Sequence, residues 1–136
     1  MKTVALIEKG KDGKFGIFTP DMESTLIGSG ATVAAAKADF ERSVEEVLAA
    51  FAEAGEALPD ELKEVEFEYR YDIASVFNFF DYINVSRFAA HAGMNASLLR
   101  QYKSGGTYIS EHQALKIENA LHRCGAELMS LSLIAH

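Results

Sequence analysis

The chain has 136 residues, of which 49% are apolar and 24% are charged, and its formal net charge is −7. This length suits one ordinary domain or two small ones, and the composition is typical of a soluble globular protein. No apolar run approaches the ~20 residues that a membrane-spanning helix needs. Charges interrupt the start of the chain, so we expect no signal peptide, and the single cysteine, Cys124, has no partner for an internal disulfide. We therefore expect a cytoplasmic protein.

The negative charge is confined to the first half of the chain. Residues 1–70 contain 8 Lys/Arg and 15 Asp/Glu, whereas residues 71–136 contain 5 of each, so the two net charges are −7 and 0. Net charge steers association rather than folding, so this division indicates two modules with different partners. We expect one domain over residues 1–71 and a second over residues 72–136, tightly coupled because only Asp72 separates them.

The first domain begins with three predicted strands. Apolar and β-branched residues predict strands over Lys2–Glu8 and Lys14–Thr19, joined by a Gly-Lys-Asp-Gly turn at Gly10–Gly13. A third strand is expected over Ser24–Gly28, ended by the Gly-Ser-Gly sequence at Gly28–Gly30.

A long helix and a fourth strand complete this domain. Thr32 is the expected N-cap of the helix and Gly55 its C-terminal stop. Apolar residues between them recur at spacings of three and four and predict one buried stripe. Its members are Val33, Ala36, Phe40, Val44, Val47, Leu48 and Phe51. Alternating apolar and charged residues over Val65–Tyr71 predict a half-buried antiparallel strand. The expected fold class is α+β, with a small antiparallel sheet and one long helix in the order β-β-β-α-β.

The pattern of the second domain is helical throughout, which predicts an all-α domain. The expected helices are Ile73–Ile83, Val85–Ala92, Ala96–Ser104 and Glu111–Cys124, with Asp72, Asn84, Asn95 and Ser110 as their N-caps. From Gly125 onward two alternatives stay open: a short helix followed by a strand, or one more helix.

Residues 84–110 have the features of a helix-turn-helix. Gly93 lies in the turn, where a positive φ favours glycine, and Ala89 lies where two such helices touch. The residues expected on the buried side are Phe88, Ala92, Met94, Leu99 and Tyr102. With the Gly-bearing loop and supporting helix that follow, the stretch Ile73–Leu121 resembles the lambda-repressor-like, five-helix DNA-binding family.

The polar residues of this stretch are the candidate DNA-binding residues. Arg and Lys suit phosphate or guanine, and Asn and Gln suit adenine. The candidates are Asn95, Ser97, Arg100, Gln101, Lys103 and Arg87. Residues 84–110 contain no Asp or Glu, and their local net charge is +3. The alternative is a helical bundle with no nucleic-acid role.

Three stretches of the first domain carry a second resemblance. Ile7–Asp21 is a charged hairpin that ends in a Pro-Asp pair, Gly28–Phe51 is a Gly/Thr turn entering an Ala-rich acidic helix, and Gly55–Pro59 is a Gly-x-x-x-Pro loop. In this order they resemble the HicB family of antitoxins over residues 4–60. The resemblance implies a partial ribonuclease-H-like sheet that binds and blocks HicA, a small basic RNA-cleaving toxin. An acidic domain attracts such a partner. The candidate toxin-binding residues are Glu8, Asp12, Asp21, Glu41 and Glu45.

The two resemblances together imply the antitoxin of a type II toxin–antitoxin pair that also represses its own operon by binding operator DNA. One alternative is a stand-alone transcription regulator whose first domain senses a ligand or dimerises. Another is an enzyme with a degenerate nuclease domain.

We expect no enzymatic activity, cofactor or metal. A nuclease of this fold needs carboxylates that converge on two Mg²⁺ ions. The carboxylates available are those of Asp12, Asp21, Asp39 and Glu41, but Asp12 lies in a turn and the first strand offers only Glu8, at its end. His112, His122 and Cys124 lack zinc-finger spacing.

We further expect a homodimer that forms through the C-terminal region. Three cations neutralise few phosphates, so tight DNA binding needs two copies on paired half-sites. The end of the chain is rich in apolar residues that a monomer would expose. They are Leu128, Met129, Leu131, Leu133 and Ile134.

Overall fold

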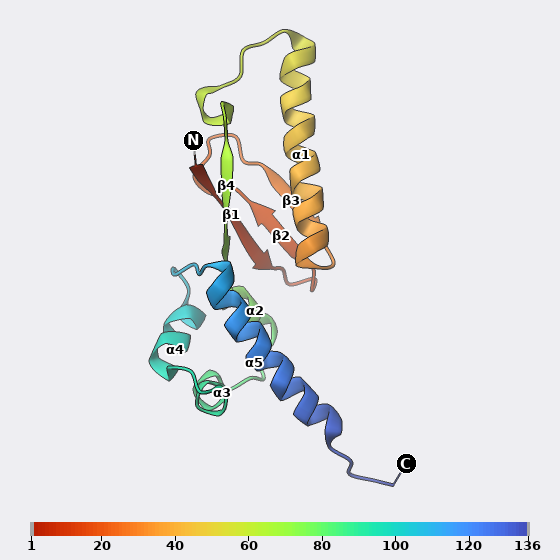
Figure 1. Cartoon of the computed structure of the whole chain (residues 1–136), viewed down its shortest axis with the longest axis vertical. Helices are drawn as coiled ribbons and strands as arrows, with labels where there is room; N and C mark the ends of the chain where they lie inside the picture. Colours follow the sequence, from red (N-terminus) through yellow and green to blue (C-terminus); the bar gives the residue numbers. More distant parts are fainter. Residues whose placement is uncertain (1, 136) are drawn as a thin grey trace.

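A computed structural model describes residues 2–135 of the chain and gives an α+β architecture (Figure 1). Residues 2–71, here called the α/β half, contain four strands, one long helix and a short 3-10 turn. These elements are β1 (Lys2–Lys9), β2 (Phe15–Phe18), β3 (Ile27–Gly30), α1 (Val33–Ala54), the turn Asp60–Leu62 and β4 (Glu66–Tyr71). Residues 72–135, the helical half, contain α2 (Ile73–Phe79), α3 (Val85–Ala92), α4 (Ala96–Ser104) and α5 (Glu111–Ser130).

The sheet is mixed, so the prediction of an antiparallel sheet was wrong. Its strand order is β3-β2-β1-β4, and β4 pairs parallel to β1, with Lys2 opposite Glu66 and Ile7 opposite Tyr71. The other two pairings are antiparallel. The helix α1 carries the chain back along the sheet after β3, so β4 runs in the same direction as β3 and β1. Alternation of apolar and charged residues gives the buried face of a strand but not its direction.

The third strand lies further along the chain than its predicted range. It runs over Ile27–Gly30 and therefore includes the Gly-Ser-Gly sequence that was expected to end it. These glycines let α1 pack very close to the strand. A Cβ atom on Gly28 would lie 2.5 Å from the Cα of Phe40, and one on Gly30 would lie 2.6 Å from the backbone nitrogen of Ala36. The glycines mark close backbone approach rather than a turn.

The predicted stripe of α1 forms the core of the α/β half. Thr32 caps the helix by accepting a hydrogen bond from the Ala35 N–H at 3.0 Å, and Gly55 ends it with φ at 67°. Phe40 is fully buried, and its ring meets that of Phe67 edge-to-face at 5.0 Å. The rest of the stripe packs into the same cluster with Ala5, Ile7 and Ile17 of the sheet, so the stripe prediction is confirmed. Apolar burial of this kind is the main stabilising contribution of a small domain.

All four predicted N-caps of the helical half are confirmed. Asp72, Asn84, Asn95 and Ser110 each accept a hydrogen bond from the backbone N–H three residues ahead. The helices enclose a second apolar core, in which the rings of Phe77 and Phe88 lie 6.0 Å apart.

Two helix ends differ from their predicted positions. The helix α2 stops at Phe79 instead of Ile83, because Phe80 leaves helical geometry and its carbonyl accepts the Ile83 N–H in a tight turn. The helix α5 continues through Gly125 to Ser130 instead of stopping at Cys124. One glycine costs a helix only about 1 kcal/mol, and the good helix formers that follow it sustain the helix. Of the two alternatives for the chain end, helix is therefore correct as far as Ser130, and residues 131–135 have no regular structure.

The two halves meet at the carboxyl ends of β1 and β4 (Figure 1). Tyr71 exchanges two backbone hydrogen bonds with Ile109, at 2.9 and 3.0 Å, and contacts both apolar cores. The ammonium of Lys9 lies 4.4 and 4.6 Å from the ring centroids of Phe15 and Phe79, and its backbone N–H donates to Ser75 Oγ at 2.8 Å. Residues of the α/β half therefore contact residues of the helical half directly through hydrogen bonds, a lysine–aromatic contact and apolar packing.

Within the described part of the chain, no helix is both long enough and apolar enough to cross a membrane.

Candidate nucleic-acid interface

Two short capped helices, α3 and α4, are joined by a tight turn at Gly93. This residue has φ at 70°, a left-handed conformation that glycine adopts without strain. The turn is closed by the Met94 N–H, which donates to the Ala89 carbonyl at 2.8 Å. Asn95 then starts α4 at once by accepting the Leu98 N–H at 2.9 Å. The angle between α3 and α4 is therefore set by two neighbouring residues, the Gly93 turn and the Asn95 cap.

Small and apolar residues hold the two helices together. Ala89 is completely buried and Leu99 is 1% exposed, so the backbones approach closely at the position where a small residue was expected. Phe88 and Tyr102 are buried, and Ala92 and Met94 pack against the same core, as predicted. The contact leaves the other side of α4 to solvent.

Five of the six predicted DNA-binding residues lie on or next to α4, and all five are at least partly exposed. Asn95, Ser97, Arg100 and Gln101 are exposed on or next to α4, and Lys103 is half-buried in its last turn. The sixth candidate, Arg87, is exposed in the first turn of α3. The structure thus brings all six onto one pair of helices. The side-chain oxygen of Asn95 accepts one hydrogen bond in the cap, and its amide NH₂ keeps both donors for a ligand.

The guanidinium of Arg100 is held in place by two hydroxyl groups. It donates to Ser86 Oγ of α3 at 2.8 Å and to Ser97 Oγ of α4 at 3.1 Å. A guanidinium has five N–H donors, so these two contacts orient the group and leave further donors for a ligand. Sequence reasoning missed Ser86; the signal that would have found it is its position on α3 one helical turn before Ala89 and Ala90, across from α4.

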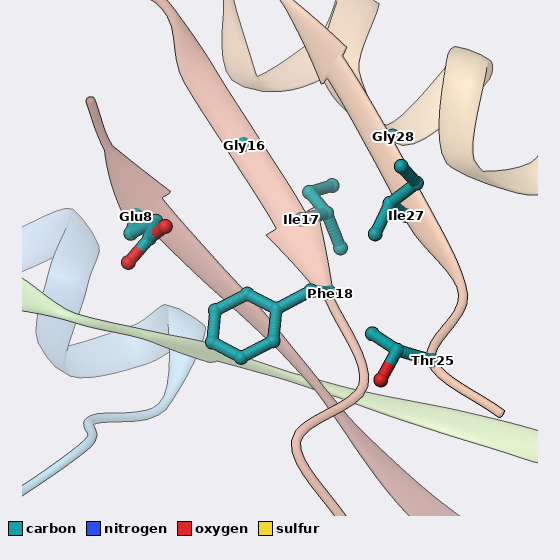
Figure 2. Close-up of a pocket in the computed structure, with 7 residues that line it drawn as sticks. All are labelled: Glu8, Gly16, Ile17, Phe18, Thr25, Ile27 and Gly28. Carbon is teal, nitrogen blue, oxygen red and sulfur yellow. The ribbon is translucent and has the colours of Figure 1, made fainter. Parts of the chain in front are cut away.

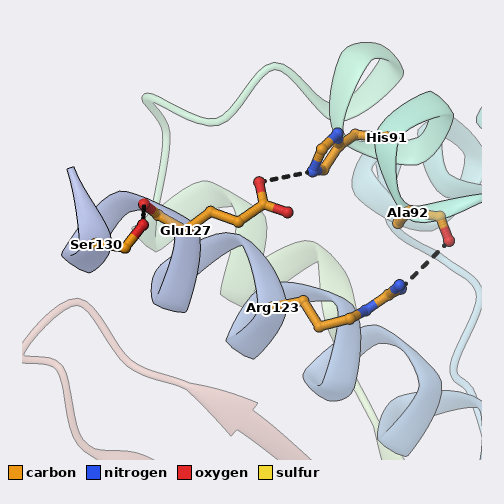
Figure 3. Close-up of polar contacts among 5 residues, drawn as sticks. All are labelled: His91, Ala92, Arg123, Glu127 and Ser130. Atoms are coloured by element: carbon orange, nitrogen blue, oxygen red, sulfur yellow. Dashed lines mark hydrogen bonds and ion pairs between the residues drawn. The ribbon is translucent and has the colours of Figure 1, made fainter.

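The helix α5 makes two polar contacts with the C-terminal end of α3 (Figure 3). The Arg123 guanidinium donates to the Ala92 carbonyl at 3.5 Å, next to the turn at Gly93. One turn further along α5, a carboxylate oxygen of Glu127 lies 3.0 Å from His91 Nε2. Both groups of this second pair are more than half exposed, so it adds little to stability.

The candidate residues of the acidic half do not form one surface. Glu8 is at the end of β1, Asp12 lies in the following turn, and Asp21 lies in the loop after β2. Glu41 and Glu45 are exposed on α1, which packs on the sheet face that carries the Ile7 side chain, opposite to the face of Glu8. The five residues therefore occupy separate places around the α/β half, although all five are at least partly exposed.

Several carboxylates of this half have structural partners. Asp12 accepts the Lys14 N–H at 2.9 Å within the turn, and Glu41 accepts the Tyr69 hydroxyl at 3.1 Å. Burial and the Glu41 contact raise the pKa of Tyr69 to about 12. Asp39 accepts the Ser29 N–H at 2.9 Å and pairs with Arg42 at 2.7 Å, and these contacts lower its pKa.

The carboxyl group of Glu8 is in a different situation. Partial burial, and secondly the nearby carboxylate of Asp72, raise its pKa above the usual value. Among the described residues no cation or N–H group contacts its side chain. Glu8 is therefore an acid for which the fold provides no compensating charge.

The carboxylates weighed for a nuclease site do not converge. Asp12, Asp39 and Glu41 make the separate contacts given above, and Asp21 lies in another loop. Over residues 2–135 no three His, Cys, Asp or Glu side chains are arranged to hold a metal ion.

No protein-family model matches this chain, and neither a curated protein nor a solved structure matches it significantly.

Proposed function

We propose that this protein is a DNA-binding antitoxin of the HicB type. Its helical half would bind operator DNA with α4 as the recognition helix of a helix-turn-helix, and its α/β half would bind a basic toxin. The observation that carries the proposal is the outer side of α3 and α4. It presents six polar or cationic side chains, with one guanidinium oriented by two serines, in a stretch without a single acid. Cations next to amide side chains suit both the phosphates and the base edges of duplex DNA.

Two properties of the α/β half support the second part of the proposal. It carries the whole net charge of −7, which attracts a basic protein and speeds its association. The β-β-β-α-β order agrees with a partial ribonuclease-H-like sheet. The described residues hold no converging carboxylates at which such a sheet would bind metal ions.

The DNA-binding part is tested by Arg100→Ala combined with Gln101→Ala. Each good base contact contributes about 1–3 kcal/mol of discrimination, so the double variant should lose binding to DNA from upstream of its own gene. A matched control is Lys11→Ala, which also removes one cation but from an exposed turn of the α/β half. A gel-shift titration measures both variants. Unchanged binding of the double variant would refute α4 as the recognition helix.

The same full-length variants separate the two proposed activities in cells. The Arg100→Ala, Gln101→Ala variant should still neutralise a co-expressed HicA-family toxin, because its α/β half is unchanged, but it should no longer repress a reporter promoter. A loss of neutralisation together with repression would show that toxin binding needs the α4 surface, and would overturn the assignment to the acidic half.

The proposal includes a dimer that forms through the C-terminal region. The apolar residues Leu128, Met129, Leu133 and Ile134 are between 69% and 88% exposed, beyond the last contact of α5 with α3. A chain that ends at Glu127 keeps that contact and loses these side chains. Light scattering should find the full chain dimeric and the shortened chain monomeric. If both are dimeric, the interface lies elsewhere.

A further inference from the structure

The sheet of the α/β half has one covered face and one open face. Ala5, Ile7 and Ile17 pack against α1. Because side chains alternate along a strand, their neighbours Leu6 and Phe18 lie on the opposite face. The register places Ile27, Phe18, Leu6 and Arg70 side by side in one row across all four strands. Leu6, in the middle of the row, is only 2% exposed, whereas Ile27 at the β3 end is 64% exposed, so the exposed apolar surface of this face lies at its β3 end.

A shallow hollow opens on this face beside Phe18 (Figure 2). Its volume is about 420 Å³, and Phe18, Thr25, Ile27 and Glu8 surround it. Gly16 contributes to the hollow because it has no side chain at the position between Glu8 and Ser29. The floor and one wall are apolar, and the carboxylate of Glu8 stands at the rim. Such a hollow accepts one apolar side chain and places a cationic neighbour of that side chain near Glu8.

Further carboxylates surround the rest of the open face. A second hollow of about 360 Å³ lies at the start of β1, and Asp21, Glu61 and Glu68 line it together with Lys2. Glu68 pairs with Arg70 at 2.8 Å, and Glu61 accepts two backbone N–H groups of the Glu23–Ser24 loop. Within residues 2–135 the side chains of Glu8, Glu66 and Asp21 make no hydrogen bond or ion pair. The open face therefore joins exposed apolar surface to unpaired negative charge.

The neighbouring surfaces are less suitable for a partner. The outer edge of β3 is blocked, because Asp39 already occupies the Ser29 N–H that an added strand would need. On α1, the Glu41 carboxylate already accepts the Tyr69 hydroxyl. The open face is thus the part of the α/β half where apolar surface, a hollow and unpaired acid coincide.

We propose that a basic protein docks on this open face, with an apolar side chain in the hollow beside Phe18 and Ile27 and a Lys or Arg opposite Glu8. The inference rests on the proposed function, in which the acidic half binds a basic protein, and it names the surface used. It predicts that Glu41 and Glu45 on α1 take no part. Charge complementarity selects this occupant over a second copy of the chain, whose own open face carries the same negative charge.

A phage-displayed library of random peptides, selected on the immobilised full-length chain, tests the proposal. Enriched peptides should contain an apolar residue flanked by Lys or Arg. In a ¹⁵N-labelled sample of this 14.9 kDa chain, such a peptide should shift the amide signals of Gly16, Thr25 and Ile27. Glu8→Lys and Ile27→Asp should each weaken its binding by about tenfold or more, the scale of losing one interface anchor.

Matched controls keep the result specific. Glu45→Lys makes the same charge change on α1, and Leu115→Asp makes the same apolar-to-acid change at an exposed position of α5. Neither control should alter peptide affinity. Amide spectra of each variant report its folding, and Ile27 is exposed enough for its replacement to leave the core intact.

Three results would overturn the proposal. If basic peptides lose affinity with Glu45→Lys but not with Glu8→Lys or Ile27→Asp, the partner is basic but docks on α1, and the proposed function survives. If no basic peptide is enriched, both the docking face and the toxin-binding role of the acidic half fail. If the chain self-associates in a way that Ile27→Asp abolishes, the occupant of the face is a second copy.

Discussion

The two halves use the same kinds of residue for different purposes. In the α/β half, glycines at 28 and 30 provide space so that α1 can lie directly on β3. In the helical half, Gly93 provides a backbone angle, and no other described group lies near the position of its missing Cβ. Polar groups differ in the same way. Asp39 and Glu41 of α1 are bound to their own sheet, whereas most polar groups of α4 face solvent. A carboxylate that already accepts a hydrogen bond from its own sheet is a poorer candidate for recognition than the Arg100 guanidinium, which keeps free donors beyond its two serine contacts.

The largest expected effect comes from one substitution made in both halves. Gly28→Ala places a methyl group 2.5 Å from the backbone of Phe40, so α1 must move off the sheet, at a cost of about 3 kcal/mol. Gly125→Ala has open space within the described structure and lies inside α5, where alanine should stabilise the helix by about 0.5–1 kcal/mol. Urea denaturation followed by circular dichroism measures both. Equal effects would mean that β3 and α1 are not in close contact.

Gly93→Ala tests the effect of the backbone conformation alone, without any steric clash. A side chain at Gly93 meets no described atom within 4 Å, so any cost comes from the left-handed conformation, about 1–2 kcal/mol. Gly93→Asn is the informative control, since asparagine tolerates this conformation better than alanine and should recover part of the loss. Denaturation midpoints that rank glycine, asparagine and alanine in that order support the turn. A neutral alanine variant contradicts it.

Lys9 should stabilise the junction between the α/β half and the helical half. Lys9→Ala removes an ammonium that lies among the rings of Phe15, Phe79 and Phe80 and donates to the Gly13 carbonyl at 2.8 Å. A cation–π contact contributes about 0.5–2 kcal/mol, so we expect a loss of about 1–2 kcal/mol. Lys11→Ala, two residues along and exposed, should change the free energy of unfolding by less than about 0.5 kcal/mol. If the two variants match, the aromatic contacts do not stabilise the junction.

The smallest expected effect is a pH response of the α/β half. The pKa of Tyr69 is raised from 10.0 to about 12, so its neutral form is favoured by folding. The stability that this provides is complete below pH 10 and is lost as the pH rises from 10 to about 12. Ultraviolet titration of tyrosinate should show a late ionisation that Tyr69→Phe removes and Tyr82→Phe retains. Persistence of the late step in Tyr69→Phe would exclude Tyr69 as its source.

The sequence predicts best what neighbouring residues decide. The four N-caps of the helical half, the turn at Gly93 and the stripe of α1 follow from side chains within a few positions, and all are confirmed. The predictions of the direction of β4 and of the range of β3 were wrong. The first depends on pairing with β1, and the second on the close approach of α1 to Gly28 and Gly30, neither of which the residues within the strand reveal. The end of α2 was wrong for a related reason: the rings of Phe79 and Phe80 pack around Lys9, some 70 residues earlier.

The candidate sites show the same limit. The outward position of Arg100 and Gln101 follows from helical spacing, and both are exposed. The orientation of Arg100 depends on Ser86 in another helix, which spacing within α4 does not contain. Negative charge could be assigned to the first half from composition, but not its division among the open face, the turns and α1. That division depends on the three-dimensional arrangement of the strands.

Because α5 runs without a break to Ser130, the directions in which its last side chains point are set by the rest of the helix. Successive helical residues turn by about 100° and rise by about 1.5 Å. Because α5 is continuous and Ile117 buries it in the same apolar core as α4, the direction in which Leu128 and Met129 point is set relative to α4 as well. Insertion of one alanine between Glu127 and Leu128 would rotate the apolar end by about a quarter turn while removing no apolar side chain. In the proposed dimer joined there, the two α4 helices would then point in different directions, so the spacing of the proposed DNA half-sites would depend on the length of α5 as well as on its contacts.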